Sequence, residues 1–266
     1  MNASPTPPPR PAHPAPRFNT ATAPAIRPDY SAEQRTAWLA RHEEFLAAAG
    51  RDEADLLFLG DSLTDHWRSR GLAAWARLLG PLRALNFGLA GDRTQQLLWR
   101  IEHGKLERLS PRATLVLIGT NNLDPGFGEP SLTPRNSPDE IVAGILSVVD
   151  AIALQLPLTM IVLQAVFPRG GPASAAQTAI DLINDDLRTR VARRAGVRLV
   201  DFGPGLLAQD TPAAAIFLPD RLHLTEGGYD AWGRALAACL SDLGMRVSPE
   251  SRRHRAALEF PLPSAP

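Results

Sequence analysis

The chain has almost no cysteine, no long apolar run and no excess of charge of either sign. Its single cysteine, Cys239, cannot form an intramolecular disulfide, and its place in the apolar run LAACL predicts a buried thiol. One cysteine is compatible with a reducing compartment. No stretch of about 18 apolar residues occurs, so the sequence predicts no membrane-spanning helix.

The charge balance bears on the partners to be expected. Lysine plus arginine and aspartate plus glutamate each number 28, which gives a formal net charge of zero. Without an overall field, neither nucleic acid nor an anionic membrane surface is an expected partner. The first residues, MNASPTPPPRPAHPAP, lack the apolar core of a secretory signal peptide, so the prediction is a cytoplasmic location.

Both ends of the chain differ from its middle in composition. Nine of the 25 prolines fall within residues 1–28, and such a segment buries too little apolar surface to offset its ordering entropy. We therefore predict a disordered arm over residues 1–28, with a proline-rich docking peptide as the alternative. Residues 247–266 are again polar and contain proline, which predicts a C-terminal tail. One domain is expected over residues 29–246.

Between these ends, short apolar runs alternate with helix-like segments. Strands are predicted at residues 56–59, 84–87, 114–118, 160–166 and 197–200. Helices are predicted at residues 31–49, 62–79, 94–103, 139–154, 175–194 and 225–243. This alternation favours an α/β protein whose crossovers produce a parallel sheet. The expected fold is a flavodoxin-like three-layer α/β/α sandwich with five parallel strands.

Polar and glycine-rich segments follow four of the predicted strands. They are Gly60-Asp61-Ser62, Gly88 to Gly91, Gly119 to Asn122, and Asp201. In an open parallel sheet the carboxyl ends of the strands form one edge, and ligands bind beyond that edge. The sequence therefore predicts that these segments converge on a single site.

The residue types in these segments suit hydrolysis of an ester or amide. That chemistry needs a nucleophile, a base within hydrogen-bond reach, a group that orients the base, and donors for the oxyanion. Ser62 lies in a strand-to-helix turn, and Asn121 follows a strand with its amide available. Asp220 and His223 are three residues apart, close enough for one turn to present both. Each motif alone is compatible with an ordinary turn, but their combination favours catalysis.

The same residues match four signature blocks of a known family. They are Gly60-Asp61-Ser62-Leu63, Asn86-Phe87-Gly88-Leu89-Ala90-Gly91-Asp92, Gly119-Thr120-Asn121-Asn122 and Asp220-Arg221-Leu222-His223. The chain resembles the SGNH, or GDSL, hydrolases over residues 29–243. LLFLGDSLTDHW, FPRG and HLTEGGY look like the branch typified by the catalytic subunits of intracellular platelet-activating-factor acetylhydrolase (type IB) and their bacterial relatives.

This resemblance implies a role for each matching residue. Ser62 would be the nucleophile and one oxyanion donor through its N–H. Gly91 would donate its backbone N–H, and Asn121 its side-chain amide. His223 would be the general base, with its tautomer held by Asp220. The implied reaction is hydrolysis of short-chain carboxylic esters, acetyl esters above all, through an acyl-serine intermediate.

The sequence differs from the family pattern at two places, and these differences leave more than one class of substrate possible. Ala90 stands where close relatives often carry glycine, which changes the turn without removing a donor. The loop over residues 123–137 is longer than in the animal enzymes and lies where part of the substrate would bind. A carbohydrate O-acetylesterase is therefore an alternative function, and a non-catalytic interaction module on the same fold is an alternative of another class.

Other candidate groups suggest no second chemistry. His66 lies one helical turn after Ser62 and is the rival base, although its position points along the helix. Asp61 is expected to bond nearby backbone, and Trp67 and Trp232 are expected in the core. The sequence contains neither a complete set of metal ligands nor a nucleotide-binding loop, so no metal and no cofactor are predicted. The expected partner is a small-molecule ester, and a homodimer stays open.

Overall fold

Five short strands pair in parallel in the order β2-β1-β3-β4-β5. They are β1 (Leu56–Gly60), β2 (Ala84–Gly88), β3 (Ala113–Leu117), β4 (Met160–Gln164) and β5 (Val197–Val200). The computed structural model describes residues 19–28, 30–50, 53–124, 135–206 and 212–246. This strand order is that of the flavodoxin-like sheet, so the predicted fold class is confirmed.

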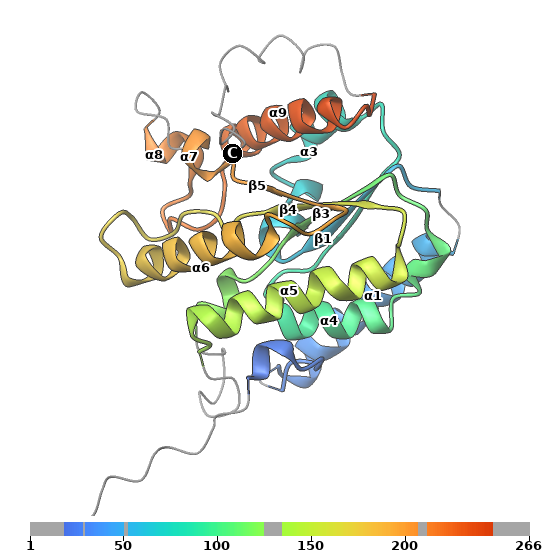
Figure 1. Ribbon diagram of the computed structural model, residues 1–266, viewed down its shortest axis with the longest axis horizontal. Helices are drawn as coiled ribbons and strands as arrows, with labels where there is room; N and C mark the ends of the chain where they lie inside the picture. The colour runs from blue at the N-terminus through green and yellow to red at the C-terminus, as the bar shows by residue number, and fades with distance from the viewer. Residues whose placement is uncertain (1–18, 29, 51–52, 125–134, 207–211, 247–266) are drawn as a thin grey trace, which may run out of the picture.

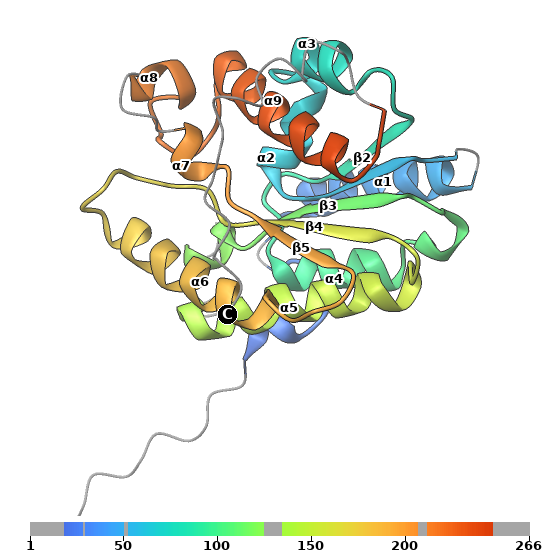
Figure 2. The same ribbon diagram turned by 45° about the horizontal axis from the view of Figure 1, so that its top comes forward.

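Helices cover both faces of the sheet (Figures 1 and 2). One face carries α1 (Ala32–Ala49), α4 (Thr94–Glu102), α5 (Pro138–Gln155) and α6 (Ala175–Val191). The other carries α3 (Leu72–Ala74), α7 (Gly203–Leu206), α8 (Ala213–Ile216) and α9 (Glu226–Asp242). The short α2 (Ser62–Asp65) begins directly after β1, and 3-10 turns lie at Thr20–Thr22, His66–Arg68, Leu106–Arg108 and Thr120–Leu123.

The strands separate two apolar cores because successive side chains point to opposite faces. In β1, Leu57 and Leu59 pack into the cluster beneath α1, α4, α5 and α6. Leu56 and Phe58 pack into the cluster beneath α9. Every residue of β1 is buried, as expected for a central strand of a parallel sheet with both faces covered.

Most predicted elements are found within a few residues of their expected ends. The capping box at the start of α1 is present, with the Gln34 N–H donating to Ser31 Oγ at 3.2 Å. The helix predicted over residues 62–79 is wrong, because the chain breaks there into α2, a 3-10 turn, α3 and a π-helical turn at Trp75–Leu79. A Cβ at Gly71 would lie 2.6 Å from the Trp67 ring, so glycine permits a close approach at the break.

The predicted disorder of residues 1–28 is wrong for residues 19–28, and residues 1–18 lie outside the described part of the chain. Residues 19–28 pack against α4 and α5. The Ala25 N–H donates to the Gln95 carbonyl at 3.1 Å, and Thr94 Oγ1 donates to the Ala21 carbonyl at 2.8 Å. Ala21 and Arg27 are buried. This segment is therefore part of the domain; the predicted tail at residues 247–266 also lies outside the described residues.

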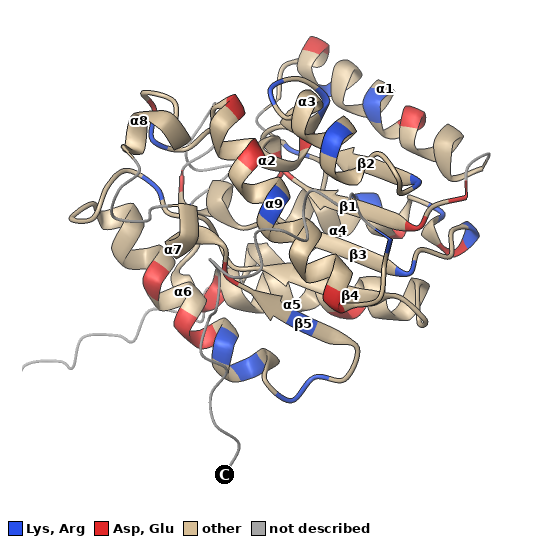
Figure 3. Ribbon diagram, turned by 90° about the horizontal axis from the view of Figure 1, so that it is seen from above, with Lys and Arg blue, Asp and Glu red and all other residues tan. Residues whose placement is uncertain are grey.

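Positions of both charge signs are interspersed along the ribbon in Figure 3. On α6 acidic positions precede basic ones, and Arg188 and Arg190 occupy the last turn, where cations favour the helix dipole. Within the described residues, no helix combines the length and the apolar character that crossing a bilayer requires.

A glycine in α5 provides a test of how residues 19–28 pack. A Cβ at Gly144 would lie 2.7 Å from the Ala21 carbonyl oxygen and 2.7 Å from Thr94 Oγ1. We expect Gly144→Ala to lower the free energy of unfolding by about 1–3 kcal/mol, because overpacking forces the backbone apart. Urea unfolding measures this change.

Gly50→Ala is the matched control for Gly144→Ala. A Cβ at Gly50 meets no atom closer than 3.5 Å, and its φ of −84° suits alanine. This variant should keep the wild-type midpoint or exceed it slightly. Equal midpoints for Gly144→Ala and Gly50→Ala would contradict the packing of Ala21 on α5.

Candidate active site

Three residues predicted from the sequence form a continuous hydrogen-bonded chain. Ser62 Oγ lies 3.0 Å from His223 Nε2. His223 Nδ1 lies 2.7 Å from Asp220 Oδ2. When Nδ1 carries the proton and donates it to the carboxylate, Nε2 is left as an acceptor for the Ser62 hydroxyl. The arrangement can therefore remove the hydroxyl proton of Ser62.

The turn after β1 fixes the place of Ser62. The Leu63 N–H donates to Asp61 Oδ1 at 3.0 Å, so Asp61 bonds its neighbouring backbone as predicted. Burial raises the pKa of Asp61 to about 7, although the hydrogen bond from Leu63 opposes that shift. At Gly60 a Cβ would lie 2.3 Å from the Leu117 carbonyl oxygen, so only glycine lets β1 enter this turn. These contacts leave Ser62 7% exposed.

A short hairpin turn presents Asp220 and His223 together. Phe217 and Leu224 form an isolated antiparallel bridge, and the Leu218 N–H donates to the His223 carbonyl at 2.8 Å. Asp220 Oδ1 accepts the N–H groups of Leu222 and His223, each at 3.0 Å. One carboxylate thus folds the turn with one oxygen and orients the imidazole with the other.

These hydrogen bonds also set the ionisation of Asp220. Burial raises the pKa of Asp220, but bonds from the His223 side chain and from the backbone N–H groups of His223 and Leu222 outweigh it. The net effect lowers the pKa to about 2. Asp220 is therefore a carboxylate throughout the range in which an imidazole titrates.

A tyrosine links the helix that follows the His223 turn to the helix that carries Ser62. Tyr229 lies in α9, is fully buried, and donates its hydroxyl to the Leu63 carbonyl at 2.8 Å. Burial raises the pKa of Tyr229, so the hydroxyl keeps its proton. Tyr229 was not singled out from the sequence, where an aromatic residue in an apolar helix indicates only core packing.

A buried ion pair lies beneath the site and was also missed. Arg100 Nε donates to Asp92 Oδ2 at 2.6 Å, and the two side chains are 2% and 0% exposed. Trp38 Nε1 donates to Asp92 Oδ1 at 2.7 Å. Burial raises the pKa of Asp92, whereas Arg100 and Trp38 lower it by stabilising the carboxylate. The Asp92 side chain lies in the interior.

The two other predicted oxyanion donors lie on loops that this network holds. Gly91 has a φ of +82°, a left-handed conformation that favours glycine. Arg27 Nη1 donates to the Gly91 carbonyl at 2.8 Å. Asn121 Nδ2 donates to the Asp92 carbonyl at 2.8 Å, which fixes the amide and leaves its second hydrogen for another acceptor.

His66, the rival base, lies beside the catalytic candidates without replacing His223. Its ring centroid is 5.2 Å from that of His223, so it lines the site. Its Nδ1 lies 2.7 Å from Arg70 Nη1. Burial, the charge of Arg70 and the neighbouring His223 lower the pKa of His66 to about 4. The Ser62 hydroxyl contacts His223 and not His66.

The remaining residues named from the sequence lie in the core. Trp67 and Trp232 are 1% and 0% exposed, with ring centroids 5.0 Å apart, so their predicted packing role is confirmed. Cys239 is buried as predicted. Among the described residues, no three histidine, cysteine, aspartate or glutamate side chains are grouped so as to hold a metal ion.

Comparison with known proteins places this geometry in a family. Residues 58–231 match the model of the GDSL-like lipase/acylhydrolase family. The chain belongs to this family. The alpha2 subunit of platelet-activating factor acetylhydrolase IB from Homo sapiens is 30% identical over 235 residues, covering 88% of this chain and 96% of that protein. The alpha1 subunit from Homo sapiens is 29% identical over 245 residues, covering 92% and 98%.

Solved GDSL hydrolases share the fold. A GDSL-like lipase from Bacteroides thetaiotaomicron superposes with a TM-score of 0.61 at 16% identity, covering 77% of this chain and 98% of that one. An acetylxylan esterase from Geobacillus stearothermophilus superposes with a TM-score of 0.56 at 21% identity, covering 73% and 95%. Family membership makes this GDSL protein a serine ester hydrolase, which favours the enzymatic interpretation over an interaction module.

Removing Arg100 tests the importance of the buried ion pair. Arg100→Met keeps most of the volume but leaves the Asp92 carboxylate buried without its cation. We expect a loss of about 3–5 kcal/mol in the free energy of unfolding, measured by urea denaturation, because an uncompensated buried charge is costly. Arg83→Met is the control: Arg83 is 58% exposed and pairs with Glu53 and Asp55 at the surface, so its loss should cost about 1 kcal/mol or less. Similar losses in both variants would contradict a special role for the buried pair.

Proposed function

We propose that this GDSL hydrolase cleaves short-chain carboxylic esters, acetyl esters above all, through an acyl intermediate on Ser62. The observation that carries the proposal is the chain of contacts from Ser62 Oγ to His223 Nε2 at 3.0 Å and from His223 Nδ1 to Asp220 Oδ2 at 2.7 Å. These are the distances that a nucleophile, its base and an orienting carboxylate require.

Acylation begins when His223 Nε2 takes the proton of the Ser62 hydroxyl. Ser62 Oγ then forms a bond to the carbonyl carbon, and the carbonyl oxygen becomes an oxyanion. The N–H groups of Ser62 and Gly91 and the amide of Asn121 would stabilise that charge. The carbon–oxygen bond to the alcohol breaks as His223 returns the proton to the departing oxygen, and the ester's acyl group stays on Ser62.

Deacylation repeats the same steps with water. His223 Nε2 takes a proton from the water, whose oxygen attacks the acyl carbon, and the same donors stabilise the second oxyanion. Collapse releases the carboxylic acid and returns the proton to Ser62 Oγ. Asp220 remains a carboxylate throughout, because its pKa is lowered to about 2, and it stabilises the imidazolium by accepting from Nδ1.

The proposed preference for acetyl groups is based on the names of the relatives and not on contacts within this chain. The alpha2 and alpha1 relatives are named as acetylhydrolases of platelet-activating factor, and one structural neighbour is named as an acetylxylan esterase. Both names specify removal of acetyl groups from very different alcohols. A carbohydrate O-acetylesterase is therefore the second candidate. The predicted cytoplasmic location and the homodimer stay predictions.

Replacement of the nucleophile tests the proposal. Ser62→Ala should lower kcat on an activated aryl acetate by roughly a million-fold, because the bond-forming oxygen is gone. The same variant should lose covalent labelling by a fluorophosphonate probe, read by intact mass. Ser69→Ala is the control, because Ser69 is exposed and its hydroxyl donates to the His66 carbonyl rather than to a proposed catalytic residue. Near-normal turnover by Ser62→Ala would exclude Ser62 as the nucleophile.

The pH profile distinguishes the two histidines. The kcat/KM of the wild type, measured above about pH 5, should rise with pH as the histidine base loses its proton. His66→Gln should keep this rise at the same pH, because His66 has a pKa of about 4 and is already neutral there. His223→Gln should abolish turnover. Loss of the rise in His66→Gln would identify His66 as the base instead.

A further inference from the structure

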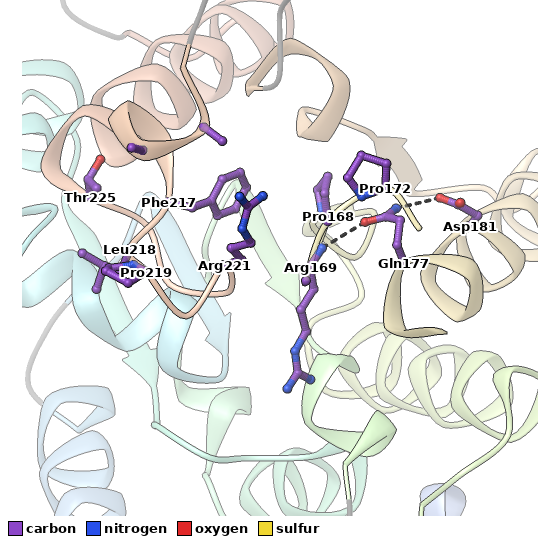
Figure 4. Close-up of a pocket in the computed structure, with 14 residues that line it drawn as sticks. Pro168, Arg169, Pro172, Gln177, Asp181, Phe217, Leu218, Pro219, Arg221 and Thr225 are labelled. Atoms are coloured by element: carbon purple, nitrogen blue, oxygen red, sulfur yellow. Dashed lines mark hydrogen bonds between the residues drawn. The ribbon is translucent and has the colours of Figure 1, made fainter. Parts of the chain in front are cut away.

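A pocket of about 830 Å³ lies beside the turn that carries Asp220 and His223 (Figure 4). One wall consists of residues 168–172 together with Gln177 and Asp181 of α6. The opposite wall consists of residues 213, 214, 217–219, 221 and 225. In Figure 4, Phe217 and Arg221 stand on one side of the space, and Pro168, Pro172 and Gln177 stand on the other.

The pocket borders the proposed catalytic residues through its backbone. Arg221 and Thr225, both in its wall, flank His223 in the sequence. The Gly170 N–H donates to the Arg221 carbonyl at 3.0 Å, which ties the two walls together next to His223. The pocket thus lies beyond the carboxyl end of β4, at the edge of the sheet where ligands bind in this fold.

The wall formed by residues 168–172 also reaches the Asn121 loop. Arg169 Nη1 donates to the Thr120 carbonyl at 3.3 Å, one residue before Asn121. Arg169 also pairs with Asp124 at 2.5 Å, so its charge is already matched. The pocket is therefore adjacent to both the proposed base and one proposed oxyanion donor.

Of the two arginines that line the pocket, only Arg221 has a guanidinium for which the described residues provide no ion pair or hydrogen-bond partner. In Figure 4 the Arg221 side chain lies next to the Phe217 ring, and Leu218 and Pro219 of the same turn also line the pocket. Across the pocket, the Asp181 carboxylate accepts a hydrogen bond from Gln177 Nε2 at 2.8 Å. Among the residues that line the pocket, the charge on the His223 side is thus positive.

The backbone of Arg221 is also unusual. Its φ is +50°, a left-handed conformation that costs free energy in any residue with a Cβ and is uncommon outside glycine, asparagine and aspartate. The hydrogen bond from Gly170 to its carbonyl helps to hold this conformation. Strained residues of this kind concentrate at functional sites, where the surrounding structure maintains them.

We propose that this pocket binds the alcohol half of the substrate ester and that Arg221 binds an anionic oxygen group on that alcohol. The proposal rests on the acyl-Ser62 mechanism. In that mechanism the departing oxygen takes its proton from His223 Nε2, so the alcohol leaves on the His223 side, where the turn bearing His223 forms the pocket wall. Apolar walls with one unpaired guanidinium suit a carbon framework bearing a carboxylate or a phosphate.

Matched acetyl esters test the proposal. The substrates are 4-acetoxybenzamide, 4-acetoxybenzoate and 4-acetoxyphenyl phosphate, which place a neutral, a carboxylate and a phosphate group at the same position of the departing phenol. The measured quantity is the ratio of kcat/KM for each anionic ester to that for the neutral one, each divided by the rate of its uncatalysed hydrolysis. At low ionic strength we expect ratios of roughly two- to fivefold in the wild type, as for a solvent-accessible ion pair.

Arg221 variants identify the source of this preference. Arg221→Gln should reduce both ratios to about one, Arg221→Lys should retain part of them, and Arg221→Glu should invert them. Because each ratio compares two substrates of one variant, it cancels any effect of the substitution on the fold of the turn. Arg35→Gln, an exposed arginine on α1, should keep the wild-type ratios. Added salt should lower the wild-type ratios by screening.

The outcomes separate this proposal from the function on which it rests. Ratios near one in the wild type, or ratios that persist in Arg221→Gln, would overturn the Arg221 subsite while hydrolysis of the neutral ester by Ser62 still stood. A high ratio for only one of the two anions would identify which anionic group the subsite accepts. Absence of turnover on all three esters, together with no labelling of Ser62, would overturn both proposals.

Discussion

The ion pair between Asp92 and Arg100 connects the ends of three strands at the edge where the site forms. Besides Asp92, Arg100 donates to the Phe87 carbonyl in β2 at 2.8 Å and to the Gly60 carbonyl in β1 at 3.2 Å. The Asp92 carbonyl in turn accepts the Asn121 amide from the segment after β3. A single guanidinium thus fixes the relative positions of the loops bearing Ser62, Gly91 and Asn121. Desolvation of both charges is costly, and full hydrogen bonding offsets it.

His223, the proposed base, approaches this rigid edge from a separate part of the chain. Asp220 folds its own turn with one carboxylate oxygen and orients His223 with the other. Tyr229 then joins α9 to the Leu63 carbonyl. Ser62 and His223 are 161 residues apart in the sequence. The bond from Tyr229 to Leu63 and the bonds from Asp220 to the His223 turn set the distance between them. Positional precision of this kind is what base catalysis by a histidine requires.

The sequence predicts the sheet and the meeting of Ser62, Asp220 and His223 because both depend on local patterns. Apolar runs mark the strands, and the strand-end rule places the polar segments that follow them. The Asp92–Arg100 pair was not predicted, since nothing in the pattern of α4 distinguishes a buried arginine from a solvated one. Residues 19–28 were misjudged because their proline content indicates disorder locally, whereas the contacts that order them reach Gln95 and α5.

The ordered residues 19–28 contact a loop of the proposed active site. Arg27 lies 31 residues before the first residue matched by the family model, yet its guanidinium holds the Gly91 carbonyl. A substitution of Arg27 would leave every signature block intact and still shift the Gly91 peptide, a proposed oxyanion donor. Substitutions in residues 19–28 can therefore change the turnover rate of this hydrolase. They would do so without replacing any residue of the four signature blocks.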